Sequence, residues 1–350
     1  MNYLYDSLIK LDANVNVIYT CGNSKSPDDI LIKNIVVPSN LNIVARVLNE
    51  LYMGLAIFYR TFRIPNTYCF IITSPPFFTM LLLSFILRIQ GKKYWLDIRD
   101  PYPQSISDAK IISNKSFLYK LFDLLCKISY EHAIGILVAR PSFLNNIHCE
   151  NTYLFSNGFP KKLFLTRPTK YIKKTVCIHG FFGYFQDTSL ILELGDLLKG
   201  LNIDLVIIGG GNKFKDLMKL KSKNIKIYNV MPHEKCMSII SRCHIGLSIR
   251  TFSNLSLSSL PVKVWEYLGL NIPCIVYPPL KLDPAIKKTN LVYAVNERCK
   301  YLILEKINLI FEGYLINSYY KNNISNMNLL QRYTRENLSD QAAKKILKSI

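Results

Sequence analysis

The sequence predicts an α/β fold in which parallel sheets are wound by right-handed crossover connections. Short apolar, β-branched runs alternate with longer helical patterns along the whole chain. Strands of this kind, separated by helices, form parallel sheets buried on both faces. The alternation occurs twice, on either side of a basic, proline-containing and aperiodic stretch at residues 158–174. We therefore expect two domains, and a length of 350 residues agrees with that number.

In the first half, strands are expected at residues 14–20, 69–74, 93–98 and 134–139, and helices at 2–11, 77–89 and 116–133. The apolar stretch from Tyr68 to Ile89 is about long enough to span a bilayer, but Pro75 and Pro76 interrupt it. Its helical part is either an interfacial membrane helix or, as we favour, a core helix of the domain.

In the second half, strands are expected at residues 175–180, 204–210, 225–230, 244–249 and 273–278, and helices at 188–201, 233–243, 261–269 and 334–350. The linker places the domain boundary near residue 165. We therefore divide the chain into an N-terminal domain (1–164), a C-terminal domain (165–325) and a terminal segment (326–350).

The composition excludes several classes of protein and indicates an anionic partner. With 49% hydrophobic, 12% aromatic and 19% charged residues, the chain is not intrinsically disordered, and 15 Gly and 16 Pro exclude a collagen-like repeat. The formal net charge of +20 favours nucleic acid, an anionic membrane face or a phosphorylated substrate. A merely Lys-rich surface is the alternative. Residues 1–160 carry 15 basic and 11 acidic groups, so most of the excess lies in the second half.

The nine cysteines indicate a reducing compartment. Their number is odd, they form no C-x-x-C pair, and most lie in apolar runs. The opening residues lack the apolar core of a signal peptide, so we expect a cytoplasmic protein. A metal site at His233, Cys236, Cys243 and His244 is conceivable, but the spacing fits no standard zinc pattern. A helix with the two cysteines on its buried face explains the same residues.

Ligands in open α/β sheets bind at the carboxyl ends of strands, so the loops that follow strands are candidate sites. The loop at 97–105 sets Asp97, Arg99 and Asp100 beside two prolines. A rigid turn with alternating charge is a plausible site. Equally, Asp100 could start a turn while Arg99 pairs with Asp97 at the surface.

Two glycine-rich loops also follow strands. Gly180 and Gly183 stand in HGFFG, and a Gly triplet occupies residues 209–211. Glycine lets the backbone approach a phosphate, and the next helix N-terminus favours negative charge. Tight strand-to-helix turns explain both loops as well.

The loop and helix from Arg250 to Gly269 carry the remaining candidates. Pro261 suits a first helical position, with Lys263 in the first turn and Glu266 one turn later. A lone acid in an apolar helix needs polar partners if it is buried, and two sugar hydroxyls would satisfy it. The alternative is a solvent-exposed Lys263–Glu266 pair.

Together these segments resemble retaining glycosyltransferases of the GT-B fold, family 4, in the bacterial branch that builds O-antigen, capsule and lipopolysaccharide. The matching segments follow one another along nearly the whole chain: TSPPFF, WLDIRDPYPQS, FSNGF, HGFFGYFQDTSLILE, LVIIGGG, KIYNVMPHEKCMSIISRCHIGLSI and LPVKVWEYLGLNIPCIV. The last is similar to the family pattern "PsKl.EYla.g.Pvi" and is the most specific of them.

The resemblance implies two Rossmann-like domains facing a cleft, and it implies roles for the candidates. Glu266 would bind the ribose hydroxyls of a nucleotide-sugar donor. Lys263 and Arg250 would face its diphosphate, helped by backbone N–H groups from Gly180 to Gly183. The acceptor would bind the N-terminal domain, with Arg99 and Asp100 as catalytic residues facing the cleft. The terminal helix would cross back to that domain.

The resemblance also implies that no metal or other cofactor is needed, because cations at the diphosphate stabilise the leaving group. The sequence agrees, since it has no D-x-D triplet. The expected partners are a nucleotide-sugar donor, a lipid-linked glycan acceptor and an anionic membrane surface, and not nucleic acid. We expect a peripheral protein on the inner face of the cell membrane.

Two departures from the family pattern bear on activity. Many family members have a second Glu eight positions before the ribose-binding one, where this chain has Ser258. The family also begins with a strand and a Gly-rich loop, whereas this chain opens on a helix pattern. We therefore expect the N-terminal domain to lack its first strand.

These observations leave three hypotheses. The leading one is an enzyme that moves a sugar from a nucleotide diphosphate to a lipid-linked oligosaccharide. A degenerate, non-catalytic membrane partner in a polysaccharide assembly complex is the second. A basic nucleic-acid-binding protein is the third, although no dense Arg/Lys stripe or known nucleic-acid motif occurs.

Overall fold

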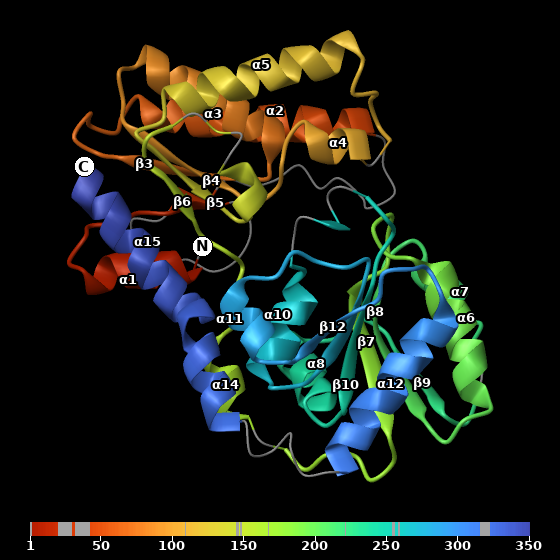
Figure 1. The fold of residues 1–350 in the computed structure, drawn as a ribbon. Coiled ribbons are helices and arrows are strands. Elements are labelled where there is room, and N and C mark those ends of the chain that lie inside the picture. The colour runs from red at the N-terminus through yellow and green to blue at the C-terminus, as the bar shows by residue number, and fades with distance from the viewer. Residues whose placement is uncertain are drawn as a thin grey trace. The chain divides into compact units, whose positions relative to one another are not determined.

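The computed structural model describes residues 2–19, 30–31, 43–108, 110–144, 147, 149–166, 168–220, 222–253, 256–257, 260–315 and 323–350. The chain forms two compact units, Met1–Ser156 with Leu338–Ile350 (unit 1) and Asn157–Asn337 (unit 2). Both contain a parallel sheet with helices on its faces (Figure 1), so the predicted fold class is confirmed. The boundary expected between residues 164 and 165 lies a little beyond the structural division.

Unit 1 is built on a four-stranded parallel sheet in the order β3-β4-β5-β6, with strands Phe70–Ser74, Tyr94–Ile98, Gly135–Val138 and Thr152–Leu154. The helices of this part of the chain are α1 (Asn2–Lys10), α2 (Ile43–Thr61), α3 (Phe77–Ile89), α4 (Gln104–Asp108), α5 (Phe117–Glu131) and the 3₁₀ turn η1 (Pro141–Phe143). The strand expected at 14–20 is much shorter: β1 (Ile18–Tyr19) pairs with β2 (Ile30–Leu31) in a separate two-stranded sheet.

Helices cover both faces of this sheet (Figure 1). On one face α3 and α5 pack on β4 and β5, with Phe77 and Met80 of α3 fully buried. This makes α3 a core helix, the interpretation we favoured. On the other face α1 and the terminal helix α15 (Arg335–Ser349) enclose Trp95, whose Nε1 donates to Ser349 Oγ at 3.2 Å.

Unit 2 is built on a six-stranded parallel sheet in the order β12-β11-β10-β7-β8-β9. Its strands are β7 (Thr175–Phe181), β8 (Asp204–Gly210), β9 (Ile225–Tyr228), β10 (Ile245–Ile249), β11 (Cys274–Tyr277) and β12 (Val292–Ala294). Its helices are α6 (Thr188–Lys199), α7 (Phe214–Leu217), α8 (His233–Ile240), α10 (Val262–Gly269), α11 (Pro284–Lys288), α12 (Lys300–Leu315) and α14 (Asn323–Leu330), with 3₁₀ turns η2 (Lys161–Leu165) and η3 (Gln331–Tyr333). The five strands expected here are all present.

Two helix predictions need correction. The helix expected to run to residue 243 ends at Ile240, although Cys236 and Cys243 are buried as expected. The helix expected at 334–350 is α15, but the terminal segment 326–350 as a whole is not one helix, because it also contains the end of α14 and η3. The cause is Thr334, which has extended backbone and caps α15 by accepting from the N–H of Asn337 at 3.3 Å. Within α15, residues from Leu338 onward belong to unit 1.

The order of the strands in the unit 2 sheet indicates where a ligand should bind. From β7 the chain builds β8 and β9 to one side, then returns to build β10, β11 and β12 on the other. The order therefore reverses between β7 and β10, and ligands in such sheets bind at the carboxyl ends of the strands at this point. Residues at the ends of β7 and β10 are the first to consider.

We expect Gly209→Ala to destabilise unit 2 strongly. A Cβ at Gly209 would lie 2.0 Å from the carbonyl oxygen of Gly180, on the neighbouring strand. Separating β7 from β8 at their carboxyl ends should cost about 3 kcal/mol or more of the free energy of unfolding. Urea denaturation measures the loss. Gly200→Ala is the control, since nothing lies within 4 Å of that Cβ, and an equal effect of both changes would refute the packing argument.

Candidate functional site

The predicted donor residues of unit 2 gather at the carboxyl edge of its sheet. The loop after β7 runs beside the end of β10, because Gln186 and Arg250 form an antiparallel bridge. α10 then places Lys263 against this loop, where Nζ donates to Gln186 Oε1 at 3.2 Å. A Cβ built on Gly180 would lie 3.6 Å from the same nitrogen. The amine of Lys263 therefore lies directly over Gly180.

The backbone around this loop corrects one detail of the prediction. Gly180 has φ +121°, a conformation that needs glycine. The N–H of Phe182, however, donates to the carbonyl oxygen of Gly210 at 2.7 Å. It is therefore not available to a phosphate, contrary to the expectation for the Gly180–Gly183 backbone. Gly183 packs on the ring of Phe181, where an added Cβ would lie at 2.8 Å.

Lys263 is a buried amine. It is 8% exposed, and its nitrogen lies 5.7 Å from the ring centroid of Phe182. Burial lowers the pKa of Lys263 to about 7; the nearby Arg250 adds to the lowering and Glu266 opposes it. This burial excludes the solvent-exposed Lys263–Glu266 pair.

Arg250 is also buried and lies at the end of β10. Its N–H extends the ladder to β11 by donating to the carbonyl oxygen of Tyr277 at 2.8 Å, and Nη2 donates to the carbonyl oxygen of Ser256. The side chains of Lys263 and Arg250 are thus near enough to affect each other electrostatically, and Lys263 lies beside Gly180. A multiply charged anion such as a diphosphate is the ligand such a pair suits.

Glu266 accepts hydrogen bonds from two histidines. Nε2 of His179, at the end of β7, lies 2.7 Å from Oε2, and Nε2 of His233, the first residue of α8, lies 2.7 Å from Oε1. Burial raises the pKa of Glu266, but the two hydrogen bonds more than offset this effect and hold it at about 2. The carboxylate is therefore ionised and can only accept.

Neither histidine was predicted from the sequence as a site residue. His179 stood in a motif interpreted through its glycines, and His233 was considered only as a metal ligand. A signal existed in β7, because His179 directly follows the apolar run at residues 176–178.

The conceivable metal site is not formed. His233 bonds Glu266, whereas the Nδ1 of His244 accepts from the N–H of Thr175 at 3.2 Å. Across the described part of the chain, no group of three or more His, Cys, Asp or Glu residues is arranged to hold a metal ion.

The predicted residues of unit 1 lie at the carboxyl end of β4. Nε of Arg99 lies 2.8 and 3.0 Å from the two carboxylate oxygens of Asp97, and Nη1 donates to the carbonyl oxygen of Phe155 at 3.1 Å. Asp100 instead pairs with Arg140 at 3.2 Å. The Arg99–Asp97 pair we considered is thus formed, but Asp97 is fully buried rather than on the surface, and burial raises its pKa. Of the two predicted residues, Asp100 is the more accessible, with 41% of its side chain exposed.

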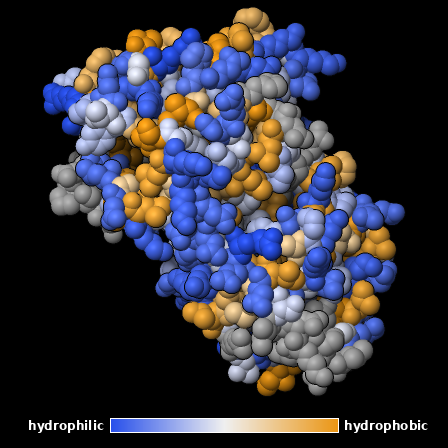
Figure 2. Space-filling model, turned by 60° about the vertical axis from the view of Figure 1, so that its left-hand side comes forward, coloured by the Kyte–Doolittle hydropathy of each residue, from blue (hydrophilic) through white to orange (hydrophobic). Residues whose placement is uncertain are grey.

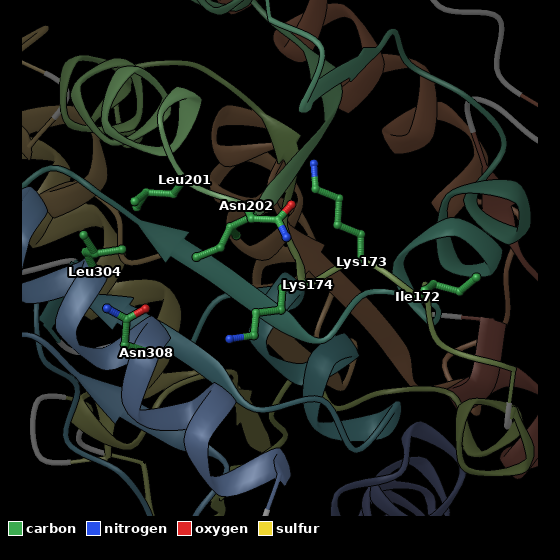
Figure 3. Close-up of a pocket in the computed structure, with 8 residues that line it drawn as sticks. Ile172, Lys173, Lys174, Leu201, Asn202, Leu304 and Asn308 are labelled. Atoms are coloured by element: carbon green, nitrogen blue, oxygen red, sulfur yellow. The ribbon is translucent and has the colours of Figure 1, made fainter.

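A hollow of about 380 Å³ in unit 2 lies elsewhere (Figure 3). It is lined by Ile172, Lys173, Lys174, Leu201, Asn202, Ile203, Leu304 and Asn308. Several of these residues directly precede β7 and β8, so the hollow lies at the amino edge of the sheet. Its lysines are engaged, since Lys173 pairs with Asp204 at 2.5 Å and Lys174 lies 5.2 Å from the ring centroid of Phe311. Ligands in such sheets bind at the carboxyl edge, so this hollow lies at the opposite edge from the expected ligand site.

Comparison with known proteins identifies the fold. No protein-family model and no curated protein matches the chain. Among solved structures, the lipopolysaccharide outer core galactosyltransferase WaaB superposes with a TM-score of 0.61 over 100% of this chain and 94% of its own, at 12% identity. Anabaena Alr3699/HepE in complex with UDP gives 0.56 over 87% and 84%, at 11% identity. The glycotransferase of kitacinnamycin gives 0.54 over 99% and 94%, at 11% identity.

The fold is GT-B. Units 1 and 2 correspond to its two α/β domains, each with a parallel sheet of its own. In this GT-B chain the Lys263–Gly180 contact and the carboxylate of Glu266 lie in the second domain, on α10 and the end of β7.

Proposed function

We propose that this chain is a glycosyltransferase that moves a sugar, with retention of configuration, from a nucleotide-diphosphate sugar to a lipid-linked oligosaccharide in bacterial surface polysaccharide synthesis. The observation that carries the proposal is the buried amine of Lys263 over Gly180, one helical turn from an ionised Glu266. A cation and a hydroxyl acceptor at this spacing match the diphosphate and ribose of one nucleotide. GT-B neighbours support it, since Anabaena HepE structures contain UDP or UDP-glucose.

The chemistry follows from the charges. Lys263 and Arg250 would bind diphosphate oxygens and stabilise the negative charge that develops there as the glycosidic bond breaks. Glu266 would accept from ribose hydroxyls and orient the nucleotide. No step requires a metal ion or another cofactor. Asp100, with Arg99 beside it, would act on the acceptor from the carboxyl edge of the unit 1 sheet. Ser258, at the position of the family's second Glu, lies outside the described residues.

A nucleotide screen tests the enzymatic proposal. Calorimetry with UDP, ADP, GDP and dTDP should show binding of at least one, and the matching nucleotide sugars with a lipid-linked acceptor should release that diphosphate. Failure to bind any of them would instead support the non-catalytic partner. DNA binding with a steep salt dependence would support the nucleic-acid hypothesis.

We also propose that the protein works as a peripheral protein on the cytoplasmic, anionic face of the membrane. The support comes from α2, whose exposed side chains form an apolar stripe at helical spacing: Val44, Leu48, Tyr52, Leu55 and Tyr59, continued by Phe62. Residues 43–96 contain six basic residues and one acidic residue, Glu50, which accepts from the N–H of Phe78 at 2.9 Å. An apolar stripe in a basic region suits an anionic lipid surface.

Three other features bear on how the protein could meet a membrane or its compartment. Within the described residues, none of the helices combines the length and apolar character needed to cross a bilayer. On the face shown in Figure 2, hydrophilic side chains predominate and hydrophobic ones are scattered among them. The described cysteines are all free.

We expect the paired change Leu48→Glu and Leu55→Glu to weaken membrane binding at least about tenfold, because two apolar contacts are lost and two negative charges are gained. Co-sedimentation with vesicles of phosphatidylcholine and phosphatidylglycerol measures it. Leu309→Glu, at an exposed position of α12, is the control and should bind as the unchanged protein does. Equal binding by all three proteins would refute the assignment of α2.

A further inference from the structure

Glu266 is held by one fixed and one solvent-facing histidine. His179 is buried on β7, whereas 47% of the His233 side chain is exposed at the start of α8. Each histidine bonds a different oxygen of the carboxylate, so both oxygens are fixed in direction. The three residues come from three separate elements of unit 2.

The protonation of this group follows from its contacts. An ionised carboxylate only accepts, so the Nε2 atoms of both histidines must carry hydrogen. Burial lowers the pKa of His179, while its hydrogen bond to Glu266 opposes the effect, so this imidazole is neutral. Its Nδ1 therefore has no hydrogen and accepts from the hydroxyl of Tyr267, 3.1 Å away. Tyr267 donates to His179, and His179 donates to Glu266.

Tyr267, the first donor in this series of hydrogen bonds, is itself held in place by the sheet. Its ring lies where a Cβ on Gly246 of β10 would fall, only 2.5 Å from the ring atoms. Tyr267 is fully buried, and its hydroxyl also lies near the carbonyl oxygens of Leu247 and Cys177, at 3.3 and 3.4 Å. Backbone atoms of two strands thus determine how Glu266 is presented.

The carboxylate keeps acceptor capacity after both bonds. Each carboxylate oxygen has two lone pairs and uses one for an imidazole N–H. The remaining lone pairs can accept only from donors such as hydroxyl groups. A carboxylate that rotates freely can accept from a hydroxyl in many positions. A carboxylate held in one orientation instead favours two hydroxyls at a defined separation.

We propose that His179 and His233 are positioning residues that hold Glu266 for recognition of a vicinal pair of ribose hydroxyls. The site then selects ribonucleotides over 2′-deoxyribonucleotides. This inference rests on the proposed function, because it assigns Glu266 to the ribose of the donor.

Matched variants of His233 test the proposal, because that residue is half-exposed and should tolerate change. His233→Gln keeps an N–H donor, and His233→Phe keeps a ring without one. Calorimetry gives the ratio of the dissociation constants of 2′-deoxy-UDP and UDP. The 2′-deoxyribose and ribose forms of ADP, GDP and thymidine diphosphate are compared in the same way to cover other bases. We expect a ratio of about 10 or more for the unchanged protein and for His233→Gln, falling to about 3 or less for His233→Phe. His132→Phe, an exposed histidine in unit 1, is the control and should keep the full ratio.

His179 gives a second readout that does not depend on a nucleotide. Nitrogen NMR of the imidazoles should show His179 as the neutral Nε2–H form, and Glu266→Gln should change its Nε2 signal. The outcomes separate the two proposals. If no nucleoside diphosphate binds, the proposed function fails and this inference fails with it. If the unchanged protein selects ribose and His233→Phe does so equally, only the positioning role is overturned; a His179 protonated at Nδ1 and not at Nε2 also overturns it.

Discussion

Replacing Lys263 by methionine is expected to stabilise the free protein and to remove most of its affinity for a nucleoside diphosphate. Burial of the amine destabilises the folded protein without ligand, because burial disfavours the charged form and lowers the pKa to about 7. Methionine fills the same space without a desolvated amine, so the free energy of unfolding at pH 7 should rise by about 1–4 kcal/mol. Loss of a charge-assisted hydrogen bond to the diphosphate should weaken binding by about 2–3 kcal/mol, a factor of about 30–150.

The pH dependence isolates the lysine. Between about pH 7 and 10.5 the unfolded chain holds the Lys263 proton and the folded chain does not. The free energy of unfolding must therefore gain a contribution that rises with pH through this interval. Urea denaturation at a series of pH values should show this rise in the unchanged protein, and Lys263→Met should lack it. Lys219→Met, at an exposed lysine, is the control and should keep it.

Proton uptake measures the role of Lys263 in binding. A bound diphosphate raises the pKa of the amine, so at pH 8 binding should take up close to one proton. Calorimetry in buffers of different ionisation enthalpy gives this number, and Lys263→Met should abolish the uptake. Binding of unchanged strength by the methionine variant would show that the diphosphate lies elsewhere.

The fold was largely predictable because hydrophobic periodicity is local. The strand expected at 204–210 is β8 itself, and the helix expected at 77–89 is α3 itself. The three-residue strands β6 and β12 were missed, since such short and half-exposed segments carry no period to detect. The helix expected from residue 334 is α15, which begins at Arg335 directly after the capping hydroxyl of Thr334.

The site was predictable where a motif fixes residues close in sequence. Lys263 and Glu266 share one helix turn, so their common face follows from spacing. The partners of Glu266 come from 87 and 33 residues away, and only the packing of β7, α8 and α10 brings them together. The contact of Arg99 with Asp97, two residues away, was among the sequence-based alternatives, whereas its bond to the carbonyl oxygen of Phe155 depends on the packing of unit 1.

Glu266→Gln is expected to remove most transferase activity while the protein stays folded. The amide keeps the shape of the side chain but presents one weaker acceptor, and its NH₂ group opposes the N–H of one histidine. Two hydroxyl–carboxylate bonds are lost or weakened, so kcat/KM should fall about a hundredfold or more. Glu305→Gln, at an exposed position of α12, is the control and should retain full activity.

The same substitution has a stability signature whose sign is fixed by the carboxylate. The pKa of Glu266 is about 2 in the folded protein against 4.5 for an ordinary Glu, a difference that corresponds to about 3 kcal/mol. That stabilisation is fully present above about pH 4.5 and is lost as the pH falls toward 2. Glu266→Gln should therefore lower the free energy of unfolding at pH 7 and flatten its decline between pH 4.5 and 2. If urea denaturation instead shows the glutamine variant as stable as the unchanged protein at pH 7, with the same acid dependence, the two histidines do not bind an ionised Glu266 in solution.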